Sequence, residues 1–179
     1  MNKILRGCLI SMALFFLVGF GVIFFITNSI NKSISSDKLK VDDAWKGYVS
    51  QVNIRDRVLL KGKNLNMLNL VTKSEKNIQN NEKQILLSNE YILNDRIRLS
   101  GNKEVSLMDK KLYEALLNYN LNAKEFNLKY SVFPYSYLLR KKGIDLFEYF
   151  NIEYGKDNTE LINEQKRAAD WIKNGGEFK

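Results

Sequence analysis

An uncharged apolar run near the N-terminus constrains this chain more than any other feature. Residues 8–26 read CLISMALFFLVGFGVIFFI, nineteen residues without a charge, of which thirteen are Leu, Ile, Phe or Val. As a helix the run would extend roughly 28 Å, close to the hydrocarbon thickness of a bilayer. Each of these thirteen side chains contributes about −0.3 to −0.6 kcal/mol near the centre of an inserted helix. The run therefore predicts a single transmembrane helix.

A signal peptide, a lipoprotein anchor and a buried core helix fit this run less well. A cleaved signal peptide has an apolar core of only about 7–15 residues before a small-x-small cleavage site, and Ser33-Ile34-Ser35 is a faint match. A lipoprotein anchor carries its cysteine after the apolar run, whereas Cys8 opens it. Cys8 fits better as a thiol that faces lipid or the interface. A buried core helix would need a polar face for water, which residues 8–26 lack.

Basic residues flank the run on both sides and bear on its orientation. Lys3 and Arg6 precede it, and Lys32, Lys38 and Lys40 follow it. The positive-inside rule compares Lys and Arg near the two ends of a spanning helix, and it does not decide here. The N-terminal pair lies closer to the apolar run, which favours a cytoplasmic N-terminus. We expect a single-pass protein of the cell membrane, in contact with membrane lipid.

The roughly 150 residues after the anchor are enough for one domain with its own core. Pro134 is the only proline and glycine is scarce, a composition that disfavours a turn-rich β-sandwich and favours long helices. The formal net charge is +8, of which Lys3 and Arg6 contribute two. Such a charge suits anionic phospholipid or nucleic acid. However, acids are interleaved with the bases, which favours solvated helix faces, and we expect no nucleic-acid partner.

Apolar residues recur at helical spacing from residue 41 onward. Their spacings of four, three, four and seven place side chains on one face of a helix. Residues 27–40 are predicted to be a juxtamembrane linker or a continuation of the spanning helix. Asp37, or the pair Asp42-Asp43, would cap a helix that starts here. Near residues 61–64 the register is lost, and a kink, a stutter or a short turn is expected. The stripe consists of Val41, Trp45, Tyr48, Val52 and Leu59.

Two shorter stretches follow. Residues 72–84 are polar apart from Ile78 and predict an exposed helical segment or a loop. Residues 85–99 carry the next apolar set, and Ser100-Gly101 supplies a helix-ending signal after it.

The strongest helix signal comes next, with spacings of four, three, four, four, three and four. This helix should end near Ser131, because Pro134 disfavours helix in the residue before it. Residues 144–154 predict a short amphipathic helix, and residues 161–172 one more. The apolar face of the long helix consists of Met108, Leu112, Ala115, Tyr119, Ala123, Phe126 and Tyr130.

These patterns predict an all-α protein in which a single N-terminal transmembrane helix is followed by an antiparallel helical bundle. The expected organisation is a short flank (1–7), the transmembrane helix (8–26), a juxtamembrane linker (27–40), the bundle domain (41–154) and a polar C-terminal extension (155–179).

The sequence contains no recognisable catalytic or cofactor motif. It has no histidine, which excludes Ser-His-Asp and Cys-His nucleophiles, histidine zinc sites and the Glu-x-x-His pairs of di-iron bundles. Gly175-Gly176 lacks the following helix of a phosphate loop. Carboxylate pairs such as Asp42-Asp43 fit solvated or capping roles better than acid–base catalysis. We expect a protein that is not an enzyme and that uses no cofactor or metal.

One segment combines aromatic and basic side chains. Residues 133–143 read FPYSYLLRKKG, and rings and cations together favour the bilayer interface. The alternative is a loop whose rings fold back onto the bundle while its basic side chains stay in water. The candidate contacts with lipid or with a protein partner are Tyr135, Tyr137, Arg140, Lys141 and Lys142.

A spaced series of aromatic residues and asparagines resembles the signature of a known family. The series consists of Tyr119-Asn120, Phe126-Asn127 and Phe133-Pro134 at seven-residue intervals, then Gly143, with Phe147 and Phe150 nearby. It resembles the C-terminal signature of the LemA family, which reads YN-x5-YN-x5-FP followed by a glycine and an aromatic-rich end. Upstream, the VDDAW that ends at Trp45, with Gln51 and Arg55, resembles the start of that family's first soluble helix.

The chain departs from the family pattern in its middle. LemA-like chains carry an Arg-x-Asp-Leu-Ile-Pro-Asn-Leu-Val run after the first block, whereas residues 55–61 here read RDRVLLK, without proline. Residues 67–71 (MLNLV) are a partial echo, and residues 155–179 have no counterpart. The chain thus resembles a divergent member. The resemblance implies a membrane-anchored antiparallel helical bundle and no established enzymatic activity.

The aromatic–asparagine pairs are compatible with two arrangements. In the first, Tyr119, Phe126 and Phe133 would fall along one helix face and pack the bundle. Asn120 and Asn127 would then hydrogen-bond neighbouring helices and fix their register. In the second, the asparagines line a polar groove that receives a partner.

Three functions are compatible with the sequence. We expect a non-enzymatic interaction or scaffold protein of the cell envelope, which docks a membrane or envelope protein. The alternatives are a lipid-surface module that acts through residues 133–143 and an accessory subunit of a membrane enzyme.

Overall fold

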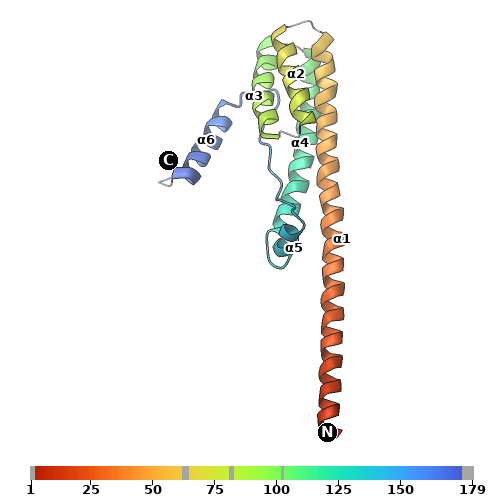
Figure 1. Ribbon diagram of the computed structural model, residues 1–179. Coiled ribbons are helices and arrows are strands. Elements are labelled where there is room, and N and C mark those ends of the chain that lie inside the picture. The colour runs from red at the N-terminus through yellow and green to blue at the C-terminus, as the bar shows by residue number, and fades with distance from the viewer. Residues whose placement is uncertain (1–2, 62–64, 81–82, 102, 175–179) are drawn as a thin grey trace. The chain divides into compact units, whose positions relative to one another are not determined.

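The computed structural model describes residues 3–61, 65–80, 83–101 and 103–174 (Figure 1). Over these residues the chain is helical and contains no strand, which confirms the all-α prediction. The six helices that they form are α1 (Lys3–Lys61), α2 (Leu65–Gln79), α3 (Lys83–Ser100), α4 (Lys103–Tyr130), α5 (Tyr135–Lys141) and α6 (Thr159–Asn174).

The chain divides into two compact units, and both α1 and α4 contribute to each of them. The anchor unit comprises residues 1–40 and 125–147, and the bundle unit comprises residues 41–124 and 148–179. Each unit therefore combines part of α1 with chain from the C-terminal half.

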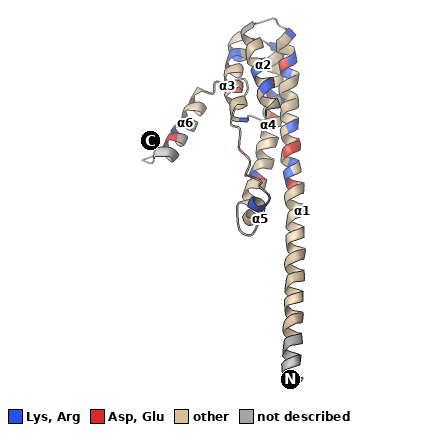
Figure 2. Cartoon of the chain, in the orientation of Figure 1, with Lys and Arg blue, Asp and Glu red and all other residues tan. Residues whose placement is uncertain are grey.

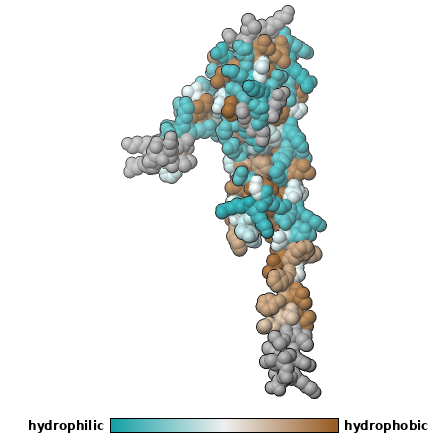
Figure 3. All heavy atoms as spheres, in the orientation of Figure 1, coloured by the Kyte–Doolittle hydropathy of each residue, from teal (hydrophilic) through white to brown (hydrophobic). Residues whose placement is uncertain are grey.

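In the anchor unit, α1 carries the apolar run. It is the one helix among the described residues that is long and apolar enough to cross a membrane. The rest of the chain covers almost none of its most apolar stretch, and no charge interrupts it between residues 11 and 26 (Figures 2 and 3). Side chains such as Phe15, Phe24 and Phe25 are exposed, an arrangement that is favourable in lipid and costly in water. The side chain of Cys8 lies outside the described residues.

α1 continues without a break from the apolar run into the bundle unit. Of the two predictions for residues 27–40, the helical continuation is the one observed, because this stretch contains neither glycine nor proline. The prediction that Asp37 or Asp42-Asp43 caps a helix start was wrong, since these residues lie in the middle of α1.

Asp37 instead joins α1 to α4 within the anchor unit. Its carboxylate accepts hydrogen bonds from Lys129 (2.8 Å), Tyr130 (2.9 Å) and Lys40 (2.9 Å). Partial burial would raise the pKa of Asp37, but the bonds from Lys129, Lys40 and Tyr130 outweigh it and lower this pKa to about 2. Ser33, one turn earlier on α1, accepts from Lys129 (2.9 Å) and lies 3.0 Å from the Tyr130 hydroxyl.

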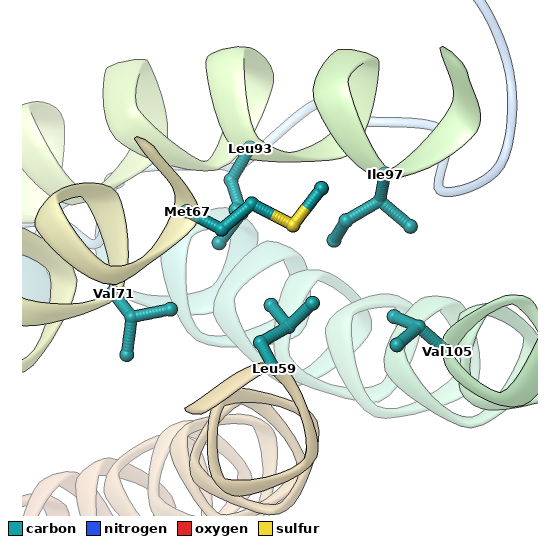
Figure 4. Close-up of a cluster of buried hydrophobic side chains, with 6 residues drawn as sticks. All are labelled: Leu59, Met67, Val71, Leu93, Ile97 and Val105. Carbon is teal, nitrogen blue, oxygen red and sulfur yellow. The ribbon is translucent and has the colours of Figure 1, made fainter. Parts of the chain in front are cut away.

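In the bundle unit, α1 to α4 pack around an apolar core. The faces predicted from the spacing are buried, among them Tyr48 and Val52 on α1 and Leu112 and Tyr119 on α4. At one end of the core, all four helices contribute apolar side chains. Their packing against one another closes the bundle there. Figure 4 shows this cluster, which consists of Leu59, Met67, Val71, Leu93, Ile97 and Val105.

The helix ends follow the turn signals closely. The lost register near residues 61–64 corresponds to the end of α1 at Lys61 and the start of α2 at Leu65, while residues 62–64 themselves lie outside the described part. α3 ends where Gly101 adopts a φ of +63°. α4 ends at Tyr130, one residue before the predicted position. α6 confirms the helix predicted near residues 161–172.

Two predictions about the C-terminal part were wrong. Residues 144–154 do not form an amphipathic helix; residues 144–153 form neither helix nor strand and run as an extended segment (Figure 1). Residues 133–143 are not a plain loop, because Tyr135–Lys141 form α5. The extended segment bonds to side chains of other elements, which the apolar spacing of its own residues does not reveal.

Candidate functional site

A buried cluster of charges lies in the bundle unit. The guanidinium of Arg55 on α1 donates to both carboxylate oxygens of Glu90 on α3, with Nη1–Oε2 at 2.6 Å and Nη2–Oε1 at 2.8 Å. It also donates to Oδ1 of Asp56, from Nη2 at 2.7 Å and from Nε at 2.9 Å. All three side chains are almost completely buried. The two parallel bonds between Arg55 and Glu90 fix the relative orientation of these side chains, in addition to the attraction between their charges.

Hydroxyl groups complete the surroundings of Glu90. Tyr154, from the turn after the extended segment, donates to Oε2 at 2.9 Å, and its hydroxyl lies 2.6 Å from that of Tyr48 on α1. Ser74 on α2 donates to Oε1 at 3.4 Å. Glu90 therefore joins α1, α2, α3 and the turn at Tyr154 through one carboxylate.

The cluster holds two carboxylates for one guanidinium, and its charges affect the protonation of Asp56. Burial raises the pKa of Asp56 to about 6, the charge of Glu90 adds to this, and Arg55 opposes it. Among the residues that the structure describes, Oδ2 of Asp56 is buried without a hydrogen-bond partner. Because Oδ1 already accepts from Arg55, a proton on Asp56 would be carried by Oδ2. Burial alone would lower the pKa of Arg55, but Glu90 and Asp56 hold it well above its usual value.

This cluster was not predicted from the sequence as a unit. Arg55 was named only for its place in the family resemblance, and Glu90 was not singled out. The sequence does hold a signal for this cluster. Two polar residues, Glu90 and Asn94, share the buried face of α3 with Leu93 and Ile97. Since Arg55 and Glu90 are fully buried, the arrangement fixes helices in place and offers a substrate no direct access.

Asparagine side chains hold the extended segment in both units. In the bundle unit, Asn120 donates to the carbonyl of Phe150 (2.6 Å) and accepts from its N–H (3.0 Å). In the anchor unit, Asn127 donates to the carbonyl of Phe147 (2.7 Å) and accepts from its N–H (2.8 Å). Each amide therefore satisfies both backbone groups of one residue, as a neighbouring strand would.

Two further asparagines extend this pattern in the bundle unit. Asn94 accepts from the N–H of Gly155 (2.8 Å) and donates to the carbonyl of Lys156 (2.9 Å). Asn158 accepts from the N–H of Glu153 (2.7 Å) and donates to the carbonyl of the same residue (2.9 Å).

These bonds correct the interpretation of the aromatic–asparagine pairs. The amides of Asn120 and Asn127 bond the backbone of Phe150 and Phe147 in the extended segment, where bonds to neighbouring helices were expected. The chain's own segment occupies the polar positions that a partner would have taken. Sequence spacing could not show this, because Asn120 and Phe150 lie thirty residues apart.

The aromatic residues of the pattern pack mainly as predicted. Tyr119 and Phe126 are buried. In the bundle unit, Trp45 is half-buried and contacts the rings of Tyr48, Tyr119 and Phe150, with centroids 5.1–5.3 Å apart.

Phe133 does not share the face of Tyr119 and Phe126, contrary to the prediction. α4 ends at Tyr130, so the heptad spacing stops before Phe133, and this ring is 84% exposed. Tyr130 takes the last buried position, where its ring lies 4.6 Å from that of Phe126.

The candidate contact residues gather at one place, which we call the tip (residues 131–146 of the anchor unit). Tyr137, Arg140, Lys141 and Lys142 are exposed. Tyr135 is half-buried, because its ring packs edge-on against Tyr130 at 5.8 Å.

Gly143 and Pro134 mark the two ends of α5. Pro134 is exposed and stands at the N-cap. Gly143 has a φ of +64° and donates to the carbonyl of Arg140 at 2.9 Å, while Ile144 donates to that of Leu139 at 3.2 Å. This is the way a left-handed residue ends a helix, and it accounts for a glycine at this position.

No family model, curated protein sequence or solved structure matches this chain. The LemA resemblance therefore stays a prediction that rests on the spaced aromatic and asparagine residues and on the block that ends at Trp45.

Proposed function

We propose that this protein is a divergent LemA-like membrane protein that acts without catalysis, by docking a protein of the cell envelope. Two kinds of observation support the proposal. The residues of the family pattern hold structural positions: Trp45 and Tyr119 form the aromatic cluster, and Asn120 holds the backbone of Phe150. In addition, the buried charged side chains of the bundle core bond to each other, as Arg55 does to Glu90.

An exposed apolar stripe on α4 carries the docking proposal. In the bundle unit, Tyr113, Leu117 and Leu121 follow one another at intervals of four residues and are 46%, 43% and 51% exposed. Residues at this spacing lie along one face of a helix. The core face of α4 is formed by other residues, such as Leu112 and Leu116. A helix that is apolar on a second, exposed face suits an apolar helix or strand of another protein.

The test is affinity purification of the full-length tagged protein from detergent-solubilised membranes, compared between stripe variants. We expect a defined envelope protein to co-purify with the parent and to be lost with Leu117→Glu and Leu121→Glu together. Leu99→Glu is the matched control, since Leu99 on α3 is 71% exposed and lies outside the stripe.

The outcomes separate the candidate functions. A partner retained by the stripe variant, or no specific partner at all, contradicts docking through α4. Recovery of one membrane enzyme would favour the accessory-subunit role. Recovery of an untagged copy of the same chain would assign the stripe to self-association.

A further inference from the structure

The tip of the anchor unit lies beside the part of α1 that leaves the membrane. The ammonium of Lys142 donates to the carbonyl of Asn31 on α1 at 3.3 Å, and Lys129 and Tyr130 bond to Asp37. These contacts fall within one compact unit. Figure 1 shows α5 alongside α1 at this level.

The distance along α1 places the tip at headgroup depth. Asn31 lies five residues beyond Ile26, the last residue of the apolar run, which corresponds to roughly 8 Å of helix. The polar interface of a bilayer adds about 5–8 Å to each side of the hydrocarbon. A membrane crossed by α1 therefore has its headgroups where the tip is.

The tip exposes the side chains that suit this environment. Phe133 is 84% exposed, Tyr137 62% and Val132 56%, although Leu139 of the same α5 is buried. Aromatic side chains are enriched at the membrane–water interface, where one part of the ring system meets apolar chains and the other meets headgroups.

The charge of the tip has the sign that anionic lipid requires. Arg140, Lys141 and Lys142 are exposed, and Asp145 is the one acid among residues 131–146. Lys32 on α1, in the same unit, is also exposed. Three basic residues near an anionic surface give only weak binding by themselves. A chain already held by a spanning helix keeps its tip at a high local concentration near that surface, so weak binding suffices.

We propose that the tip is a second membrane contact, in which Phe133 and Tyr137 enter the interface and Arg140, Lys141 and Lys142 bind the phosphates of anionic phospholipid. This inference rests on the spanning role of α1 and is independent of the protein partner proposed above. The exposed rings are assigned to lipid because the tip lies beside α1 where this helix would leave the membrane.

The experiment measures membrane depth at position 137 in the full-length protein. Cys8→Ser removes the only cysteine, and Tyr137→Cys then takes a spin label. The purified protein is reconstituted into phosphatidylcholine vesicles with or without phosphatidylglycerol. Collisions of the label with oxygen, which enters the bilayer, are compared with collisions with a nickel chelate, which stays in water.

Two label positions on α1 calibrate the readout. Phe24→Cys lies inside the apolar run, and Leu39→Cys is an exposed apolar position thirteen residues beyond Ile26, roughly 20 Å farther along the helix. In phosphatidylglycerol vesicles we expect the label at 137 to be less accessible to the nickel chelate than that at Leu39, at a depth between the two calibration positions.

Charge variants test the basic residues. Changing Arg140, Lys141 and Lys142 to Gln should lower the equilibrium constant for the contact about 100-fold, as expected for three basic residues near an anionic surface, and shift the label at 137 towards water. The label at Phe24 should not change. Salt at about 1 M should have a similar effect, because it shortens the Debye length to about 3 Å.

Two outcomes would overturn the proposal. The first is a label at 137 that is as accessible to the nickel chelate as that at Leu39 in anionic vesicles. The second is a label that becomes protected only when solubilised membrane proteins are added, which would assign the tip to a protein. The first result is obtained with the purified protein alone, so it does not depend on docking through α4. The second is repeated with Leu117→Glu and Leu121→Glu together, which removes the docking surface proposed on α4.

Discussion

At the scale of single residues, asparagine side chains replace the backbone of a neighbouring strand. Asn120 and Asn127 each satisfy the N–H and carbonyl of one residue in the extended segment. Buried backbone groups without partners are costly, so a segment without secondary structure packs against helices only where side chains supply both a donor and an acceptor. Asn has both in one short side chain.

Removal of the Asn120 amide should destabilise the protein. Asn120→Ala leaves the N–H and carbonyl of the buried residue Phe150 without this partner, at a cost of about 2–4 kcal/mol for two groups. The measurement is denaturant unfolding of the full chain in detergent, followed by the fluorescence of Trp45 with Trp171 changed to Phe.

The matched control is Asn118→Ala, two residues away on α4, where the side chain is exposed and accepts a hydrogen bond from Asn122, four residues later on the same helix. Its effect should stay within about 0.5 kcal/mol. Equal effects of the two substitutions would contradict the role assigned to Asn120.

Asp56 should make stability depend on pH. Its pKa is raised to about 6 in the folded protein, against about 3.9 for an unperturbed aspartate. The folded state therefore holds the Asp56 proton more tightly, and this contribution is complete below about pH 4 and is lost as the pH rises through 6. The loss is up to about 3 kcal/mol in the free energy of unfolding.

Unfolding measured at several pH values, with Asp56→Asn as the test, checks this prediction. The variant should lose the pH dependence between about 4 and 6, even if its stability at each pH is lower because of the buried amide. Asp43→Asn is the control, since Asp43 is exposed and should leave the slope unchanged. If the free energy of unfolding of Asp56→Asn still changed with pH as in the parent protein, a group other than Asp56 would be responsible.

At the scale of elements, the helices were predictable and the segments between them were not. α4 follows from the spacing of Leu112, Tyr119 and Phe126, because those residues meet a core that any amphipathic helix must face. By contrast, the extended segment depends on amides of α3 and α4 that lie far away in the sequence. The apolar spacing of residues 144–150 (IDLFEYF) predicts an amphipathic helix. Only the bonds with these distant amides show why the segment is not helical.

The same limit applies to the candidate sites. The basic and aromatic tip was predictable because its residues are contiguous between Tyr135 and Lys142. The charge cluster was not, because Arg55 and Glu90 lie thirty-five residues apart and meet only after α1 packs on α3. Contacts that join distant residues require the three-dimensional arrangement.

Two glycine substitutions should have effects of opposite sign. Gly143 has a φ of +64°, so Gly143→Ala should cost about 1–2 kcal/mol in backbone strain at the end of α5. Gly47 lies within α1, and an added Cβ would have nothing within 4 Å at either glycine. Gly47→Ala should stabilise the helix by about 0.5–1 kcal/mol.

Thermal unfolding of the full chain in detergent measures both substitutions. Because neither Cβ meets a neighbouring atom, the difference reports backbone conformation alone. Destabilisation by Gly47→Ala, or tolerance of Gly143→Ala, would contradict the conformations described for these residues.

At the scale of the whole molecule, α1 should hold the protein in the membrane. The full-length chain should resist extraction by alkaline carbonate. Leu17→Arg and Phe20→Arg together place two charges in the apolar run, each at a cost of about 2.5–3.5 kcal/mol near the helix centre, and should release the protein. Leu39→Arg, beyond the run, should not. Extraction of the parent chain by carbonate would contradict the spanning assignment.

The position of the extended segment also sets an order of events during synthesis. The asparagines that receive it at positions 94, 120 and 127 leave the ribosome before residues 147–156 do, and Asn158 follows last. Until then the ring of Tyr119 lacks the cover of Phe150, and Glu90 lacks the hydroxyl of Tyr154. A nascent chain that stops short of this point would lack these contacts on α3 and α4. The fold around Tyr119 and Glu90 is therefore completed only by the part of the domain that is made last.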